Sequence, residues 1–286
     1  MRKVKPYFFV APAIVWLLAI YIYPIIRVIS ASFVKTGLPD RGPVNIFNYV
    51  ILFTDIKFWY ALKNNLLFLL TIPIILIFSL LLSVILFERL KGWRVTQGVL
   101  LLPFILAIPF TGIVFTYLLQ YNGTINEVLR SINLGFLAHD WLVENNLAIP
   151  SIMGVVIWRD VGFGTVLFLS RLMSMEESVI EASLIDGAGW WQRFFHIFLP
   201  QMKSIIEFFV VIESINMFGW MFDYIYVMTS VGGQNLKFGT LDYYVYAYTF
   251  AFKNFGVAYA ACVIMLFISL ILVFIRSRVT RNLAEV

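Results

Sequence analysis

Residues 181–200 read EASLIDGAGWWQRFFHIFLP and organise the rest of the chain. Ser178 and Glu181 have the spacing of a capping box, so we predict a short helix that begins at Ser178. Gly187 and Gly189 can adopt the left-handed conformations that end such a helix. The stretch therefore predicts a short polar helix with a sharp exit.

The two halves of this stretch carry different surfaces. Glu181, Ala182 and Ser183 leave little bulk on one part of the helix, a shape suited to lying in a groove of another protein. After the glycines, Trp190, Phe194 and Phe198 recur every four residues. We expect them to form an apolar face at the membrane surface.

Composition predicts an all-α polytopic membrane protein. Of the 286 residues, 61% are hydrophobic and 13% are charged, and the mean hydropathy is +0.89. A hydrocarbon core of about 30 Å needs roughly 20 apolar residues per helix. The single cysteine, Cys262, excludes an intrachain disulfide. Six transmembrane helices are predicted at about 8–30, 65–87, 97–119, 149–170, 204–226 and 256–275, with a loop at 171–203.

Prolines and aromatic residues predict irregularities in these helices. Pro24 should kink the first helix, and Pro103 and Pro109 should bend the third. Residues 35–63 are expected to form an external loop that ends in a short amphipathic piece at 58–62. The other loops leave no room for a soluble domain.

Charge distribution predicts the topology. Twelve of the 21 Lys and Arg residues lie in the segments that we assign to the cytoplasm. Both termini are therefore expected inside, in a multi-pass protein of the cytoplasmic membrane. The net charge of +5 follows from this positive-inside pattern, so no nucleic-acid partner is expected.

The stretch at 181–200 resembles the cytoplasmic coupling loop of ABC importer permeases, in which Glu-Ala-Ala is followed by Gly and then by Ile-x-Leu-Pro. Ser183 replaces the second alanine but is also small. Lys203 and Ser204 stand where a further proline is often found. The positions that match are Glu181, Ala182, Asp186, Gly187, Ala188, Phe194, Ile197, Leu199 and Pro200.

The resemblance extends over nearly the whole chain. Residues 222–229, 243–248 and 254–260 look like the C-terminal third of sugar-importer permeases, of the maltose-transporter first-permease type. Residues 23–64 look like the N-terminal third of the same proteins. The resemblance implies one transmembrane domain over 1–286 with the type I importer fold, in a bacterial or archaeal membrane.

The resemblance also implies partners and a mechanism. A second permease, two ABC ATPase subunits and an external solute-binding protein would complete the transporter. Because the chain has no Gly-x-x-x-x-Gly-Lys-Ser/Thr motif, ATP and Mg would be used by the ATPase subunits and this chain would need no cofactor. The residues implied to dock on the ATPase are Glu181, Ala182, Ser183, Asp186, Gly187 and Ala188.

Charged residues also occur halfway along two predicted helices. A charge at the bilayer centre costs about 2.5–3.5 kcal/mol, so such residues usually face a cavity or one another. One hypothesis is a sugar site at the midplane, and the alternative is a buried Arg159–Glu213 or Arg159–Asp160 pair that only fixes helix packing. The candidate site residues are Trp158, Arg159, Asp160, Glu213, Asn216 and Trp220.

Three alternatives to sugar import by ATP remain to be compared. The same machinery could carry glycerol phosphate or another polar solute, since Arg159 could meet a phosphate. An ion-coupled secondary transporter would need symmetric broken helices and an intramembrane ion relay, which the sequence does not show. An enzyme is disfavoured because His139, His196 and Cys262 form no metal or nucleophile constellation.

Overall fold

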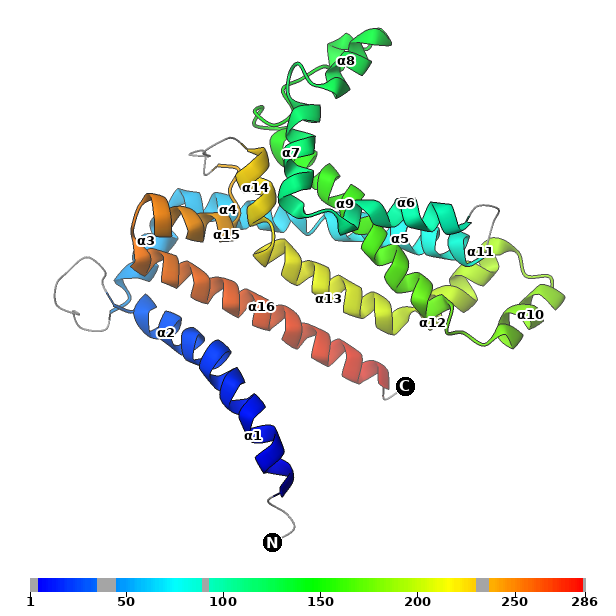
Figure 1. The fold of residues 1–286 in the computed structure, drawn as a ribbon, viewed down its shortest axis with the longest axis horizontal. Helices are drawn as coiled ribbons and strands as arrows, with labels where there is room; N and C mark the ends of the chain where they lie inside the picture. The colour runs from blue at the N-terminus through cyan, green and yellow to red at the C-terminus, as the bar shows by residue number, and fades with distance from the viewer. Residues whose placement is uncertain (1–4, 35–44, 89–92, 230–236, 285–286) are drawn as a thin grey trace.

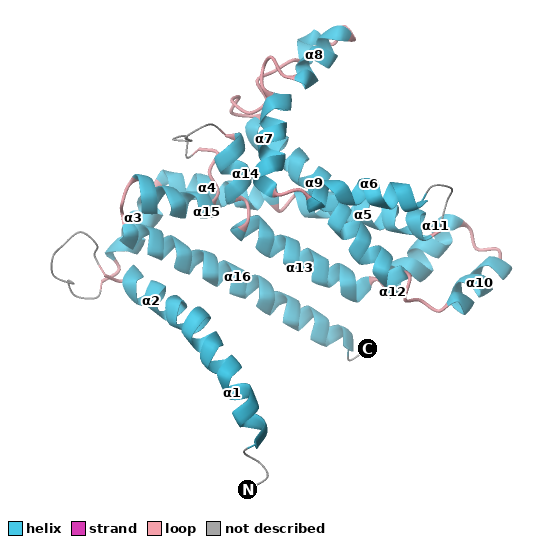
Figure 2. Cartoon of the chain, in the orientation of Figure 1, coloured by secondary structure: helices cyan, strands magenta, loops and turns pink. Residues whose placement is uncertain are grey.

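The computed structural model describes residues 5–34, 45–88, 93–229 and 237–284, and within them every regular element is a helix (Figures 1 and 2). In the described part, four helical stretches are long and apolar enough to cross a membrane. Two further pairs of helices, each sharply bent at a short break, meet the same criterion when each pair is counted as one span. The fold is therefore all-helical, with four to six candidate membrane spans.

The first span is interrupted by a wider turn of helix. It consists of α1 (Lys5–Leu17), a π-helical turn η1 (Leu18–Ile22) and α2 (Tyr23–Ser32). Pro24 lies two residues after the π turn, and a proline has no N–H to continue the regular ladder. Figure 1 shows this arm leaving the body of the molecule, with α2 lying beside α16.

The second span begins earlier than predicted. The segment at 58–62 is not a separate amphipathic piece but part of α4 (Ile56–Phe68), which follows α3 (Phe47–Thr54) and leads into α5 (Thr71–Phe87). Asp55 caps α4 by accepting a hydrogen bond from the Lys57 N–H at 3.0 Å. Residues 56–87 thus form one span.

Two adjacent asparagines near the predicted start of this helix are both buried and paired. Asn64 donates to the Gly239 carbonyl at 2.8 Å. Asn65 accepts from the Leu241 N–H at 2.8 Å and donates to the Met217 carbonyl. Polar side chains inside a span are tolerated when such partners are available.

The third span is broken, which confirms the predicted bend. Helices α6 (Trp93–Ile105) and α7 (Ile108–Leu119) meet at an angle of 96°. Pro109 lies in the first turn of α7, the position where proline is tolerated. The chain then continues through α8 (Thr124–Ser131) and η2 (Gly135–Leu137).

The fourth helix lies close to its predicted bounds, whereas the fifth and sixth differ. Helix α9 spans Ala148–Leu172. The predicted fifth helix at 204–226 ends early, as α13 (Lys203–Gly219), and is followed by the separate α14 (Phe222–Met228). Asp242 accepts a hydrogen bond from the Phe222 N–H at 2.6 Å, which stabilises the new start.

The chain ends in the longest helix. Helix α15 (Leu241–Tyr246) and the π-helical η4 (Ala247–Ala251) lead into α16 (Phe255–Ala284). This helix extends past the predicted end at 275 and includes most of the tail that we expected to follow it. It lies beside α13 (Figure 1).

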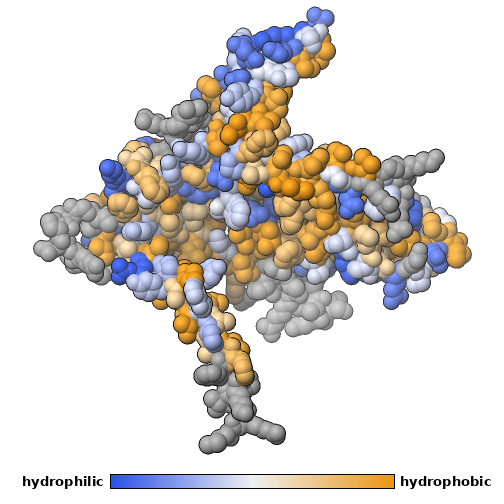
Figure 3. Space-filling model, viewed as in Figure 1, coloured by the Kyte–Doolittle hydropathy of each residue, from blue (hydrophilic) through white to orange (hydrophobic). Residues whose placement is uncertain are grey.

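Helix α9 lies at the centre and packs against α5, α6, α13 and α14. Its fully buried side chains include Ile152, Val156 and Phe168. In Figure 3, large areas of the visible surface are apolar, whereas polar residues gather at α8. Exposed apolar side chains along α1, α6, α7 and α16 indicate surfaces that contact lipid or another protein.

Candidate functional sites

The short helix predicted from the 181–200 stretch is present as α10 (Glu177–Ile185). It does not begin with a capping box at Ser178, because its N-cap is Glu176 and no side chain caps it. Its end matches the prediction at Gly187, which has φ +72°. Gly189 is extended, with φ −67° and ψ 166°, so the left-handed conformation predicted there is wrong.

The C-terminus of α10 forms a Schellman motif. The Ala188 N–H donates to the Ser183 carbonyl at 2.9 Å, and the Gly187 N–H donates to the Leu184 carbonyl at 3.1 Å. Gly187 is the left-handed residue that such a motif requires. The sharp exit from α10 is therefore fixed by backbone hydrogen bonds.

Most side chains of the predicted docking set face outward. Glu181, Ala182, Asp186 and Gly187 are exposed, Ala188 is half-buried, and Ser183 is buried. Figure 1 shows α10 projecting beyond the C-terminal end of α9, the end that the sequence analysis assigned to the cytoplasm. A groove of about 630 Å³ separates α10 from the body and is lined by residues that include Leu169, Ile180, Glu181, Leu184 and Arg193.

The aromatic segment after α10 presents the opposite face from the one predicted. It forms α11 (Trp190–Arg193), the π-helical η3 (Phe194–Phe198) and α12 (Leu199–Gln201). Phe194 and Phe198 are buried and Trp190 is half-buried, all within a cluster that includes side chains of α5 and α9. Trp191 and Phe195 are the exposed pair, with stacked rings 5.9 Å apart.

The charged residues of α9 form the ion pair that one hypothesis predicted. Arg159 Nη1 lies 2.8 Å from Asp160 Oδ1, and both side chains are largely buried. The guanidinium group also donates to the Phe104 carbonyl at 3.3 Å and lies 4.9 Å from the centre of the Phe104 ring. Helix α6 thus shares in holding Arg159.

Glu213 lies in the same polar environment but is not bridged to Arg159. It is 1% exposed, Asn216 lies beside it, and Asp160 and Arg159 are its charged neighbours. Within the part of the chain that the structure describes, Glu213 Oε2, Arg159 Nε and the Tyr224 hydroxyl are buried without a hydrogen-bond partner. Buried polar atoms of this kind normally need partners, so their gathering on three helices is a candidate ligand site.

Sequence reasoning missed Tyr224, and the two candidate tryptophans are exposed. Tyr224 is 1% exposed on α14, beyond the break that the sequence analysis did not predict. Trp158 and Trp220 are 45% and 65% exposed, and Trp158 packs edge-on against Phe115. The structure does not bring these indoles onto the polar cluster.

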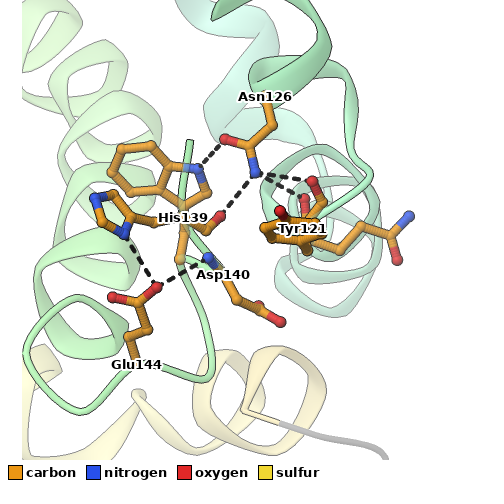
Figure 4. Close-up of polar contacts among 7 residues, drawn as sticks. Tyr121, Asn126, His139, Asp140 and Glu144 are labelled. Carbon is orange, nitrogen blue, oxygen red and sulfur yellow. Dashed lines mark hydrogen bonds and ion pairs between the residues drawn. The ribbon is translucent and has the colours of Figure 1, made fainter. Parts of the chain in front are cut away.

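A second polar cluster holds the α8 segment together (Figure 4). Asn126 is fully buried and donates to the carbonyls of Tyr121 at 3.0 Å and His139 at 2.7 Å. Its side-chain oxygen accepts from the Trp141 indole at 2.9 Å. Because both polar atoms of Asn126 are used within the chain, this cluster is structural.

The described residues contain no group of three His, Cys, Asp or Glu side chains that could hold a metal ion. The sites available for chemistry are therefore the polar cluster around Arg159 and Glu213 and the exposed helix α10. Neither presents a nucleophile beside a base.

Comparison with known families settles the class of protein. Residues 60–285 match the family of binding-protein-dependent transport system inner membrane components. The chain belongs to this family. The resemblance stated from the sequence is thereby confirmed, and permease subunits of this family are not enzymes.

Several permeases are similar to this chain along almost their whole length. The probable ABC transporter permease YurN of Bacillus subtilis is 30% identical over 279 residues, which cover 95% of this chain and 94% of YurN. The sulfoquinovosyl glycerol permease SmoG of Agrobacterium fabrum is 31% identical over 280 residues, or 95% and 89% of the two chains. The lactose permease LacF of Rhizobium radiobacter is 30% identical over 267 residues, or 91% and 88%.

The fold is similar to that of a protein whose structure has been solved by crystallography. A chain of the bacterial alginate ABC transporter, crystallised with an alginate pentasaccharide-bound periplasmic protein, superposes with a TM-score of 0.85. The alignment covers 99% of this chain and 96% of that one, at 23% identity. The permease therefore has the fold of an ABC transporter membrane subunit.

Proposed function

We propose that this chain is the membrane-spanning permease subunit of an ATP-driven importer for a sugar or oligosaccharide. The family match supports this most strongly, because it covers most of the chain. Relatives named for lactose, arabinooligosaccharides and sulfoquinovosyl glycerol support carbohydrate as the cargo. The chain would form half of the pathway, beside a second, similar permease.

In this proposal the chain crosses a bacterial or archaeal cytoplasmic membrane six times. The four continuous spans and the two bent pairs supply the six crossings. Both termini and α10 lie in the cytoplasm, as the distribution of Lys and Arg predicts. The exposed apolar surfaces then contact lipid and the second permease.

Helix α10 is the part that docks on an ATPase subunit. Its exposed side chains and its distance from the body leave it free to enter a cleft of another protein. The Schellman motif at Gly187 keeps the exit rigid, so a push on α10 moves the flanking helices as a lever. Two ATPase subunits bind and hydrolyse ATP with Mg, and a solute-binding protein delivers the cargo from outside.

Co-purification of the ATPase tests this docking role. Tagged wild type, a Glu181→Lys, Gly187→Pro variant and a Gly154→Ala control would be isolated from native membranes. Gly187→Pro is incompatible with a φ of +72°, whereas a Cβ at Gly154 would contact nothing within 4 Å. The proposal expects wild type and control to retain the ATPase and the variant to lose it. Absence of an ATPase from wild type would refute the importer.

The cluster around Arg159 and Glu213 is the proposed contact for the cargo. Its unpaired buried atoms, Glu213 Oε2 and the Tyr224 hydroxyl, are the kind of groups that meet sugar hydroxyls. Glu213→Gln and Asn216→Ala should weaken the apparent affinity for cargo in transport-linked ATPase assays. Ser214→Ala is the control, because Ser214 only bonds its own helix at Val210. Unchanged affinity in both variants would leave the cluster with a packing role.

Uptake measurements separate the candidate cargoes. Cells with and without this chain would be given labelled lactose, arabinooligosaccharides or glycerol phosphate. Loss of sugar uptake on deletion supports the proposal, and loss of only glycerol phosphate uptake supports the alternative in which Arg159 meets a phosphate. Uptake that survives ATP depletion but collapses with the ion gradient would identify a secondary transporter.

A further inference from the structure

Glu88 connects the segment after α10 to the end of α5. It is the C-cap residue of α5, and its two carboxylate oxygens bind different residues of α11. Oε2 accepts from the Trp190 indole at 3.1 Å, and Oε1 accepts from Arg193 Nη2 at 3.0 Å. We call this set of contacts the Glu88 bridge.

The Glu88 bridge is more than a solvent-exposed ion pair. The side chains of Arg193 and Glu88 are only 14% and 24% exposed, and Arg193 Nε is buried without a partner among the described residues. A charge-assisted contact in such a setting is stronger and more directional than one at the surface. Cutting it would leave a buried charge uncompensated, so the geometry is held firmly.

Apolar packing supports the same contact. The Trp190 ring stacks on Phe194 at 5.4 Å, and Phe198 packs edge-on against Phe87 of α5 at 5.9 Å. Such packing holds α11 and η3 near α5, and aromatic pairs of this kind add a modest preference of geometry. The two hydrogen bonds that Glu88 accepts fix the orientation of α11 relative to α5.

The segment before α10 is already part of the central body. It continues from α9, which packs closely against α5. Without the Glu88 bridge, apolar packing alone would hold the far side of α10, and a push could be absorbed by swinging α10 and α11 about the turn at 173–175. The chain can bend further on, between Gln201 and Lys203, where the helices meet at 70°.

We propose that the Glu88 bridge makes α5, α9, α10 and α11–η3 one rigid unit, so that Glu88 and Arg193 are positioning residues that pass the motion of the docked helix into α5. This inference rests on the proposed docking of α10 on an ATPase. The hinge of the unit is then the bend before α13. Glu88 lies about 100 residues before the docking helix in sequence, and only the fold brings the two together.

Distance measurements between spin labels test the rigid unit without knowledge of the cargo. The whole complex, with Cys262→Ala in the permease, would be placed in lipid nanodiscs with or without ATP and vanadate. One pair of labels on Phe78 of α5 and Phe195 of η3 reports on the unit itself. A second pair on Phe78 and Phe267 of α16 reports on its motion. All three positions are at least half exposed.

The inference expects a narrow distribution of Phe78–Phe195 distances in wild type, with the same mean in both nucleotide states. In Glu88→Ala this distribution should become broader, or its mean should change when nucleotide is added, while the ATPase still co-purifies. The exchange of charges, Glu88→Arg with Arg193→Glu, should narrow it again. Trp190→Phe keeps the stacked ring and loses one hydrogen bond, so it should give an intermediate width without unfolding the segment.

Two outcomes separate this inference from the proposed function. The docking role of α10 is refuted if wild type retains no ATPase, or if its Phe78–Phe267 distance is the same with and without nucleotide. If that distance responds but Glu88→Ala leaves the Phe78–Phe195 distance narrow in both states, the Glu88 bridge does not make the unit rigid. If the bridge only stabilises the fold, Glu88→Ala will lower the melting temperature and leave both distances unchanged, which also contradicts the inference.

Discussion

Replacing Gly162 with alanine should separate α6 from α9 and weaken the whole membrane domain. A Cβ built on Gly162 would lie 2.2 Å from the Leu100 carbonyl oxygen and 3.3 Å from its carbon. Ordinary van der Waals contacts of a Cβ begin at 3.4 Å. The missing side chain is therefore what allows these two helices to pack so closely.

The size of the effect follows from this geometry. The alanine methyl needs the two backbones to move apart by 1.2 Å (3.4 − 2.2), and a backbone carbonyl cannot rotate away as a side chain can. Overpacking of a well-packed interior costs about 1–3 kcal/mol. The same shift would lengthen the hydrogen bond from Arg159 to the Phe104 carbonyl, already 3.3 Å, because Phe104 lies one turn from Leu100.

Thermal unfolding of the purified permease in detergent measures this cost. Gly162→Ala should lower the melting temperature, whereas Gly154→Ala on the same helix should not, since a Cβ at Gly154 meets nothing within 4 Å. The pair controls for the higher helix propensity of alanine, which stabilises both variants alike. Equal melting temperatures for the two variants would refute the close packing of α6 on α9.

Three further changes probe other parts of the fold. Gly187→Ala places a side chain at φ +72°, a strain that costs roughly 1–2 kcal/mol. Amide hydrogen exchange at the end of α10 should therefore become faster. Gly189→Ala should leave it unchanged, because Gly189 is extended. Asn126→Ala leaves the Trp141 indole without its hydrogen-bond partner. The free energy of local opening should fall by about 2 kcal/mol, so amide hydrogen exchange across α8 should be faster. Exchange as slow as in wild type would contradict this. Burial raises the pKa of Asp242 above its ordinary 3.8, so the folded chain binds this proton more tightly and loses stability as the pH rises above that value. The melting temperature of Asp242→Asn relative to wild type should therefore increase with pH, and a constant difference would contradict it.

Hydropathy alone predicted the fold class and the position of α9, because a long apolar run leaves little choice in a membrane. It failed where polar residues inside a span are satisfied by distant backbone. The second helix was predicted to begin at about 65, but Asn64 and Asn65 lie inside the span and bond to backbone groups 152 to 176 residues away. No local pattern could reveal that pairing.

The same limit explains the errors at the candidate sites. A spacing of four correctly grouped Trp190, Phe194 and Phe198 on one face, but periodicity does not say whether that face meets lipid or protein. The charges at Arg159, Asp160 and Glu213 were correctly expected to be buried together, since the bilayer penalises them singly. Tyr224 was missed because the sequence predicted one continuous helix over 204–226. In the structure this helix ends at Gly219, and Tyr224 lies on the separate helix α14.

Helix α9 links the two candidate sites physically. It carries Arg159 and Asp160 at its middle and leads, after Leu172, directly to α10. Twelve residues of α-helix separate Asp160 from Leu172, a distance of about 18 Å. A helix wedged between α5 and α6 by Gly164 and Gly162 cannot flex over that length without moving its neighbours. Under the proposed docking of α10, a displacement carried across the turn at 173–175 would reach the polar cluster through α9, and the Phe104 carbonyl, which accepts from Arg159, would pass it to α6.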